Sequence, residues 1–361
     1  MNWLPEPHRQ NIPGFDFDLE AARKKFIGLE TKPVQGRYPV EYDPIRRHCH
    51  MTGDNNRLFL DPEYAAKSKY GAVIVPPPFV SYFAGPGIWP RGQEAPRLPA
   101  IPTPGDRNIN LTVEAEWLQP VKVGERLSVK SRYADLYFLS IRLDWCAVWT
   151  TTQNIIMNSR GDTVAIESNL GLRHRATDKV PEGQKGAPTG PVAPPPTMPE
   201  PLGSRRPTSS ATAGQLYWED VKEGDLLPIE EHPITETCIA EQVSGSQDFY
   251  AVHHDRPFAK AAGHPDIFVN TGFMRGTLGR VVTDWMGDEG WLRKFRMEMR
   301  RMNRPGDMMV CTGKVLRKYV EKGEHLVECE VWAENAREGV TTPCRAWVVL
   351  PSKPQAVGQK R

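Results

Sequence analysis

The chain has 361 residues, more than one hydrophobic core usually sustains, and its 39% hydrophobic and 25% charged residues are typical of folded proteins, so two domains are expected. The 46 Lys and Arg residues nearly balance the 44 Asp and Glu residues, which excludes a global basic field for nucleic acid. The six cysteines are scattered without a Cys-x-x-Cys pair, so neither a disulfide framework nor a metal site is expected. No stretch approaches the ~18 apolar residues of a membrane span, and the start lacks a charged segment followed by an apolar one. A cytoplasmic protein is therefore predicted.

Helical signals come first in the N-terminal half. Asp43 followed by Pro44 is the pattern of a helix N-cap with proline at the first helical position, and Gly53 marks the end of that helix. Asp54 is therefore expected in a loop directly after a helix. The apolar segment 79–89 is expected to be the central helix of this half, and strand-like runs follow at 126–138, 141–157 and 163–173.

The composition changes between Ala176 and Gly214, where prolines stand among glycine, serine, threonine and alanine. Such a segment cannot bury apolar surface and is expected to run extended as a linker. The prediction is an N-terminal module over residues 1–175, a linker over 176–214 and a C-terminal module over 215–361.

The second half repeats the order of elements found in the first. Thr235 or Thr237 can cap a helix that ends near Gly245, which places Asp248 in the following loop. A longer helix should begin at Asn270 or Thr271, and strand-like runs follow at 308–320, 325–334 and 344–350. One apolar stripe runs along the longer helix and is made of Phe273, Leu278, Val281, Val282 and Trp285.

The strand-like segment 326–332 alternates between apolar and polar residues, which is typical of a strand with one buried face. Helices early and long antiparallel strands late predict an α+β module in each half. The matching order of elements, with Asp54 corresponding to Asp248, indicates a diverged internal duplication.

The stretch 244–259 carries the most informative spacing. An Asp is followed five positions later by His, by a second acid two positions further, and by Ala six positions after the His; these residues are Asp248, His253, Asp255 and Ala259. This pattern resembles the signature of the MaoC-like, R-specific enoyl-CoA hydratase family.

The first half carries the same pattern in degraded form, with Asp54, Asn56, Asp61 and Ala65 at matching positions. Phe59 stands where the His belongs, and a phenyl ring cannot transfer a proton. The first half is therefore predicted to be non-catalytic.

The resemblance implies two tandem hotdog modules, each an antiparallel sheet wrapped around a central helix. It also implies an enzyme of lipid metabolism, a hydro-lyase that hydrates a trans-2-enoyl-CoA to a 3-hydroxyacyl-CoA or catalyses the reverse dehydration. The N-terminal module would accommodate the acyl chain. No cofactor is expected, because CoA is part of the substrate, and a homodimer is left open.

The chemistry of the pair fits this activity. Imidazole titrates near neutrality and can act as base or acid, while a nearby carboxylate can orient both the water and the ring. The resemblance implies that Asp248 and His253 share one water. The enolate that develops on the thioester oxygen needs hydrogen-bond donors, which a helix N-terminus provides. The backbone N–H groups of Thr271, Gly272 and Phe273 are the candidates.

One departure from the family pattern affects the substrate pocket. Tyr250 and Ala251 stand where the family usually has Asn and Pro. The tyrosine hydroxyl could replace the amide, or the ring could reshape the pocket. Tyr250 is therefore assigned to the substrate pocket, together with Phe59, Asp54 and Asn56 of the degraded copy.

Two other functions remain as alternatives to the hydratase activity. A hotdog acyl-CoA thioesterase would hydrolyse the thioester, but the spacing from Asp248 to His253 argues against it. A non-catalytic acyl-CoA-binding protein would bind CoA esters without turnover, and the lost His at Phe59 and the substitution at Tyr250 suggest it.

Overall fold

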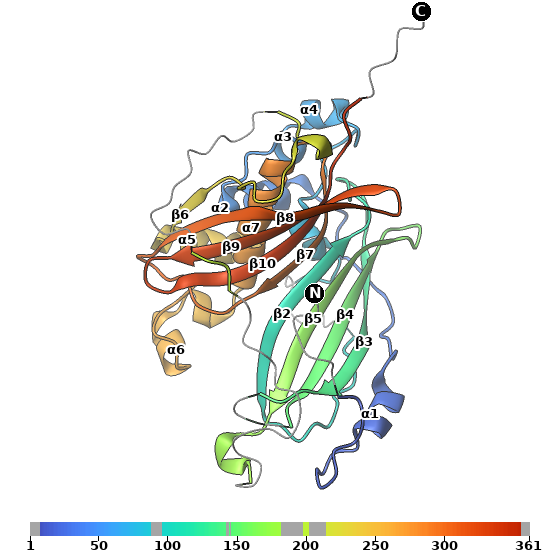
Figure 1. The fold of residues 1–361 in the computed structure, drawn as a ribbon, viewed down its shortest axis with the longest axis vertical. Helices are drawn as coiled ribbons and strands as arrows, with labels where there is room; N and C mark the ends of the chain where they lie inside the picture. The colour runs from blue at the N-terminus through green and yellow to red at the C-terminus, as the bar shows by residue number, and fades with distance from the viewer. Residues whose placement is uncertain are drawn as a thin grey trace, which may run out of the picture. The chain divides into compact units, whose positions relative to one another are not determined.

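The computed structural model describes residues 8–87, 96–141, 144, 146–181, 198–201 and 214–354 (Figure 1). Most of the expected linker at 176–214 and the end of the segment 79–89 lie outside these residues. Two compact units divide the chain, and they interleave along the sequence: residues 38–82 and 116–125 pack with the C-terminal part. The boundaries of the units thus differ from those of the expected modules, because the early helical segment packs with the later half.

The first unit is an antiparallel sheet with one helix against it. Its strands run in the order β1-β3-β4-β5-β2, and the last two residues of β2 belong to the other unit. The elements are α1 (Leu19–Phe26), β1 (Val34–Gln35), β2 (Arg107–Trp117), β3 (Ser128–Phe138), β4 (Val148–Met157), β5 (Thr163–His174) and η2 (Thr177–Lys179).

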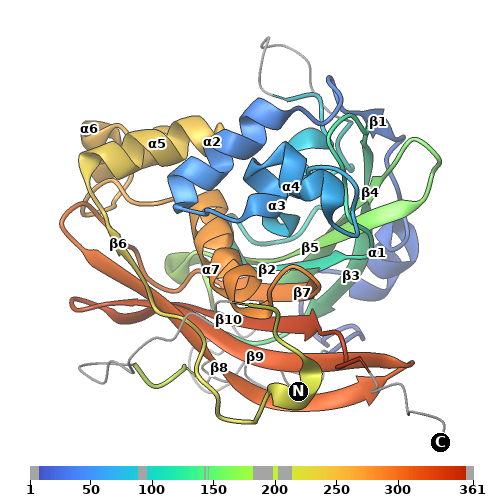
Figure 2. The same ribbon diagram turned by 90° about the horizontal axis from the view of Figure 1, so that it is seen from above.

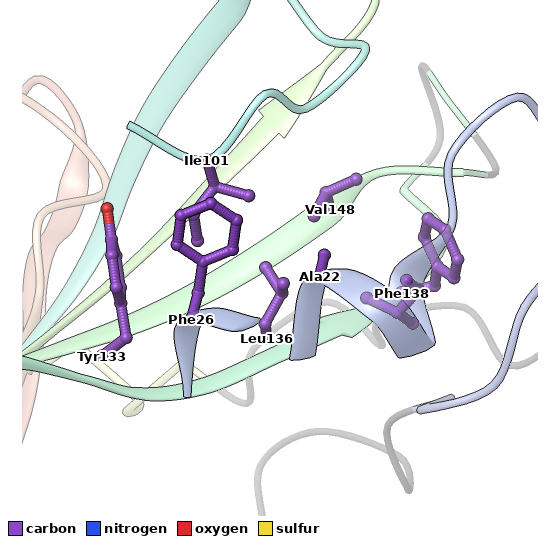
Figure 3. Close-up of a cluster of buried hydrophobic side chains, with 8 residues drawn as sticks. Ala22, Phe26, Ile101, Tyr133, Leu136, Phe138 and Val148 are labelled. Atoms are coloured by element: carbon purple, nitrogen blue, oxygen red, sulfur yellow. The ribbon is translucent and has the colours of Figure 1, made fainter. Parts of the chain in front are cut away.

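The core of the first unit lies between α1 and the sheet, as Figure 3 shows. Asp18 caps α1, because its carboxylate accepts from the Ala21 N–H at 2.9 Å. Leu19, Ala22 and Phe26 then face inward from successive turns of the helix. They pack against apolar side chains of the sheet and of the loop before β2, namely Ile101, Tyr133, Leu136, Phe138 and Val148.

The second unit contains a longer antiparallel sheet, with strand order β7-β10-β9-β8-β6. The sheet strands are β6 (Glu230–Pro233), β7 (Trp291–Glu298), β8 (Met308–Glu321), β9 (Glu324–Asn335) and β10 (Gly339–Val349). The helical elements are α2 (Tyr42–Thr52), α3 (Arg57–Leu60), α4 (Pro62–Lys67), η1 (Pro77–Phe83), η4 (Trp218–Asp220), α5 (Glu236–Ser246), η5 (Ala251–His253), α6 (Arg256–Ala261) and α7 (Thr271–Met286).

Helix α7 is the central element of the second unit. One side contacts β7, β8, β9 and β10, and α2 and α5 also pack against it, as Figure 2 shows. The five residues of the predicted apolar stripe are all buried. In the part of the chain that the structure describes, no helix is long and apolar enough to cross a membrane.

Glycines allow the helices of this unit to approach closely. A Cβ atom on Gly276 of α7 would lie 2.6 Å from the Thr52 methyl group and 2.8 Å from the His48 ring of α2. A Cβ atom on Gly245 of α5 would lie 2.6 Å from the sulfur of Met51. Larger residues at these positions would overpack the contacts of α2 with α7 and α5.

Several predicted element boundaries are corrected by the structure. Helix α2 begins at Tyr42 after the N-cap Glu41, so Asp43 lies in the first helical turn instead of capping the helix. The central helix expected from residue 79 is only the short 3₁₀ helix η1, and the strand expected from residue 141 begins at Val148. Strands β2 and β7 are not among the predicted elements, although apolar and polar residues alternate along β2 from residue 109 to residue 117.

Strand β9 differs from the expectation of one buried face, because residues 326–335 are buried on both faces. Its glutamates form ion pairs with basic residues of the neighbouring strands: Glu328 with Arg317 at 2.6 Å and with Arg345 at 3.3 Å, and Glu330 with Lys314 at 3.2 Å. Charge pairing across the strands thus lets a polar face become buried.

A charged cluster ties the end of α2 to α7. Arg280 of α7 donates from Nη1 to the Thr52 carbonyl oxygen at 3.1 Å, and its guanidinium also pairs with Asp284 at 3.1 Å and with Glu230 at 2.9 Å. Gly53, at φ 68°, ends α2 in the left-handed conformation beside this guanidinium.

Asp54 follows directly and is buried. Burial raises the pKa of its carboxyl to about 7, and the nearby Asp284 carboxylate acts in the same direction; the Asn56 N–H and the Arg280 charge oppose the shift. Because this pKa exceeds the ordinary value of 3.8 for the same carboxyl in an unfolded chain, the folded protein holds a proton that the unfolded chain releases. The contribution of Asp54 to the free energy of unfolding therefore falls as the pH rises from about 4 to about 7.

We predict that Asp54→Asn removes this pH dependence while keeping a side-chain oxygen that can accept from the Asn56 N–H. The variant should match the wild-type free energy of unfolding near pH 4 and exceed it by about 1–3 kcal/mol above pH 7. Urea unfolding across this pH range measures the difference.

The matched control is Asp43→Asn on the exposed side of α2, where the side chain is 63% exposed. Its free energy of unfolding should stay within about 0.5 kcal/mol of wild type at every pH. If the free energy of unfolding of Asp54→Asn also differed from that of wild type by the same small amount at every pH, the buried carboxyl would not be protonated in the folded state.

Candidate functional site

The loop that carries Asp248 begins where α5 ends. The Thr235 hydroxyl caps the start of α5 by accepting from the Cys238 N–H at 3.0 Å, as one of the two predicted caps. Gln247 ends the helix with φ 56°. The Asp248 N–H then donates to Ser246 Oγ at 3.2 Å, and Asp248 Oδ1 accepts from the Tyr250 N–H at 3.2 Å. One carboxylate oxygen thus shapes the loop, which leaves Oδ2 to face its partner.

That partner is His253, at the end of η5. Its Nε2 atom lies 3.5 Å from Asp248 Oδ2, and its Nδ1 atom lies 2.9 Å from the Phe268 carbonyl oxygen. A carbonyl oxygen can only accept, so Nδ1 carries the hydrogen and Nε2 of the neutral ring has a lone pair directed toward Asp248. The structure thus brings the two predicted catalytic residues together with a defined tautomer.

The pair lies at the boundary between protein and solvent. The His253 side chain is 10% exposed, whereas the Asp248 side chain is 41% exposed. A separation of 3.5 Å is long for a direct hydrogen bond and suits two groups that share a water molecule. The site can therefore admit water to a ring that is otherwise fixed by the protein.

Aromatic rings surround the imidazole. Phe268 packs edge to face against His253 with ring centroids 4.9 Å apart, and Tyr250 does so at 6.2 Å. Tyr250 also contacts Phe258 at 6.0 Å, yet it is 59% exposed. An open apolar surface therefore lies next to the pair.

The N-terminus of α7 is tied to the Asp248 loop. Asn270 caps the helix by accepting from the Phe273 N–H at 2.8 Å, and its amide Nδ2 donates to Ser246 Oγ at 2.7 Å. The first N–H groups of a helix have no partner within the helix, so those of Thr271 and Gly272 are suited to an anion.

This cap corrects one of the three oxyanion candidates. Because the Phe273 N–H already donates to the Asn270 side chain, it cannot also serve a bound thioester oxygen. The predicted start of α7 is confirmed, but the sequence does not indicate which amides the cap takes. Thr271 and Gly272 remain as candidates.

The degraded copy repeats the local geometry of the Asp248 loop. Asp54 Oδ1 accepts from the Asn56 N–H at 2.9 Å, as Asp248 does from Tyr250. The later acids cap short helices in both copies: Asp61 accepts from the Tyr64 N–H at 3.0 Å and Asp255 from the Phe258 N–H at 3.0 Å. These shared hydrogen bonds support the inferred internal duplication.

The two copies differ in the solvent exposure of their residues and in the residue two positions after the Asp. Asp54 and Phe59 are buried, so neither of these predicted pocket residues is open to a substrate in this structure. Asn56 uses its side chain to cap α3, accepting from the Leu58 N–H at 2.9 Å. Tyr250, at the matching position, is instead exposed.

Among the described residues, no group of three or more His, Cys, Asp or Glu side chains is placed to hold a metal ion. His48, which the sequence places beside Cys49 and His50, is buried and stacks on Phe79 at 4.3 Å. Burial lowers the pKa of His48 to about 3, so its ring is neutral.

Comparisons with known proteins agree with the expected resemblance. Residues 25–167 match the model of the FAS1-like dehydratase region. A 63-residue segment, 18% of this chain, is 38% identical to the beta subunit of 3-oxo-4,17-pregnadiene-20-carboxyl-CoA hydratase from Mycobacterium tuberculosis, and it spans about half (49%) of that protein.

Solved structures share the fold over most of the chain. A MaoC-like dehydratase has a TM-score of 0.66 at 16% identity, covering 91% of this chain and 99% of its own. A MaoC domain dehydratase from Chloroflexus aurantiacus has a TM-score of 0.63 at 12% identity, covering 91% and 96%. A Mycobacterium tuberculosis protein with a double hotdog fold has a TM-score of 0.56 at 11% identity, covering 91% and 97%.

The structural neighbours show the fold, and both sequence matches are to proteins described as a dehydratase region or a hydratase. The solved structures therefore show that this chain has an α+β double-hotdog fold, and residues 25–167 are similar to the FAS1-like dehydratase region.

Proposed function

We propose that the protein hydrates a trans-2-enoyl-CoA to a 3-hydroxyacyl-CoA, or catalyses the reverse dehydration, with Asp248 and His253 as the catalytic pair. The observation that carries the proposal is the fixed imidazole. The Phe268 carbonyl holds Nδ1, so that Nε2 faces Asp248 Oδ2 across 3.5 Å. The enzyme would need no cofactor, because the CoA group belongs to the substrate.

In the hydration direction, the pair orients one water molecule. Its oxygen attacks the β-carbon while Nε2 of His253 accepts one of its protons, and the Asp248 carboxylate stabilises the imidazolium that forms. The electron pair of the double bond moves into an enolate on the thioester oxygen. The proton on Nε2 then returns to the α-carbon, so that one water molecule has been added and the pair is restored.

The enolate oxygen would be held by the N–H groups of Thr271 and Gly272 at the start of α7. This helix has 16 residues, so its N-terminus carries a partial positive charge that favours an oxyanion. Backbone donors of this kind typically contribute about 10²- to 10³-fold to kcat.

We infer one active site per chain, in the C-terminal half. The buried Asp54 and the phenyl ring of Phe59 offer neither an accessible carboxylate nor a base, so the degraded copy cannot perform this proton transfer. Its role is structural, and the N-terminal half would contribute to accommodating the acyl chain.

The acyl group is inferred to be bulky and apolar. The rings of Tyr250 and Phe258, both exposed beside His253, would cover apolar substrate surface. The relative that matches 63 residues is named as a hydratase of a steroid-type CoA ester, which supports the same substrate class.

The proposed mechanism requires both members of the catalytic pair. His253→Ala removes the base and should lower kcat by about 10²- to 10⁴-fold. Asp248→Asn should lower kcat similarly while its remaining oxygen still accepts from the Tyr250 N–H. Loss of the enoyl-thioester absorbance, followed over short, long, branched and steroid-side-chain enoyl-CoAs, measures the rate.

His254→Ala is the matched control, because His254 is the exposed neighbour of the proposed base. Its rate should equal that of wild type. Full activity in His253→Ala would refute the mechanism, and release of free CoA in place of enoyl consumption would favour the thioesterase alternative.

Substitutions of Tyr250 separate the two roles considered for this residue. The exposed ring favours a packing role, so Tyr250→Phe should leave kcat/KM within about twofold for all substrates. Tyr250→Ala should raise KM by about tenfold for a steroid-side-chain enoyl-CoA and much less for a four-carbon enoyl-CoA. A loss of kcat in Tyr250→Phe would instead assign the function to the hydroxyl group.

A further inference from the structure

We propose that Gln242, Ser246 and Asn270 are positioning residues that hold the catalytic loop in register with the N-terminus of α7. The inference rests on the proposed function, since it concerns how the base and the enolate donors of that reaction are kept together. These three side chains belong to α5 and to the cap of α7, and none of them is proposed to touch the substrate.

The Ser246 hydroxyl is the junction of the network. It donates to the Gln242 carbonyl oxygen at 2.5 Å, and its oxygen accepts from the Asp248 N–H at 3.2 Å and from Asn270 Nδ2 at 2.7 Å. A hydroxyl has one hydrogen and two lone pairs, so all of its capacity is used. The Asp248 backbone N–H and the side chain that caps α7 therefore bind the same oxygen atom, Ser246 Oγ.

Asn270 connects to the same helix a second time. Its backbone N–H donates to Gln242 Oε1 at 2.8 Å, and its side-chain Oδ1 accepts from the Phe273 N–H at 2.8 Å. Asn270 and Gln242 are both fully buried. In such a site each hydrogen bond is strong and each lost partner is costly, so the arrangement resists displacement.

The two elements are also in close contact at this point. A Cβ atom on Gly272 would lie 3.2 Å from Ser246 Cβ and 3.4 Å from Asn270 Oδ1. The first turn of α7 therefore packs directly on Ser246, which precedes Asp248 by two positions. A shift of the Ser246 side chain would move Asp248 relative to the N–H groups of Thr271 and Gly272.

Helix capping alone does not account for this arrangement. The caps Thr235 and Asp255 each satisfy an amide of their own helix. Asn270 satisfies its helix through Oδ1 and in addition reaches Ser246 through Nδ2. Among the described residues, Gln242 Nε2 has no hydrogen-bond partner, which a network serving stability alone would avoid.

The reaction needs this alignment because the catalytic pair and the helix amides act on different atoms of one substrate. The base and its water must meet the β-carbon while the helix amides meet the thioester oxygen. A misplacement of about 1 Å between such groups can lower the rate by as much as about 10²-fold. Residues that set the relative position of the groups should therefore affect kcat more than substrate binding.

The test is a double-mutant cycle in the full chain, with the enoyl-CoA that wild type hydrates fastest. Ser246→Ala removes the junction, and Asn270→Ser keeps a capping oxygen for the Phe273 N–H but removes the donor to Ser246. Each variant should lower kcat by roughly 10- to 100-fold with KM nearly unchanged. The double variant should be no slower than the slower single variant, because both changes break the same bond.

Thr235→Ala is the matched control, since it removes an exposed cap at the far end of α5. It should lower the melting temperature while leaving kcat at the wild-type value. Ser246→Cys, which preserves side-chain size but accepts hydrogen bonds poorly, should show the same loss of kcat and replaces Ser246→Ala if that variant does not fold.

The outcomes separate this inference from the proposed function. An inactive wild type over the whole substrate panel overturns the proposed function and the inference with it. An active wild type with unchanged kcat in both single variants, or with multiplicative losses in the double variant, overturns the positioning network and leaves the catalytic pair standing.

Discussion

The packing of α7 between the sheet and two shorter helices is the constraint on which the second unit depends. The helix contacts four strands on one side and receives α2 and α5 as well. Gly276 allows α2 to approach α7, and Gly245 allows α5 to approach α2, because a Cβ atom at either position would overlap a neighbouring side chain. Once α7 is fixed, the ends of α2 and α5 are fixed, and each end carries one copy of the Asp loop.

The two loops illustrate how surroundings decide the role of the same residue type. Asp54 and Asp248 both accept from an amide two residues later, so their backbone geometry is alike. Asp54 is buried beside Asp284, and its raised pKa favours the neutral acid. Asp248 has a half-exposed side chain that faces an imidazole across a gap suited to water. Divergence of the neighbours has thus separated an anchoring role from the proposed catalytic one.

Sequence periodicity predicted the parts of this fold that depend on local signals. The stripe and N-cap of α7, the Thr235 cap of α5 and most strands of the second unit follow from spacing and from cap chemistry. The missed features depend on distant residues. Glutamates of β9 are buried because arginines on adjacent strands pair with them, and Asp43 lost its predicted capping role to an earlier helix start.

The candidate site also combines residues that local sequence patterns predict with residues that only the structure reveals. The spacing from Asp248 to His253 identified the pair, but the Phe268 carbonyl that fixes the tautomer has no sequence signal, since every residue carries a carbonyl group. Ser246 likewise became significant only when the structure placed it against the cap of α7. Hydrogen bonds between elements far apart in the chain cannot be read from local patterns.

The capped N-terminus of α7 combines two demands that usually compete. A helix gains stability when a side chain takes one of its first amides, whereas an oxyanion site needs amides left free. Asn270 resolves the competition by taking the Phe273 N–H alone, which leaves the Thr271 and Gly272 N–H groups to the proposed substrate. The same side chain donates to Ser246, so the group that stabilises the helix also holds the loop of the base. Stability and the proposed catalytic alignment therefore depend on one buried amide.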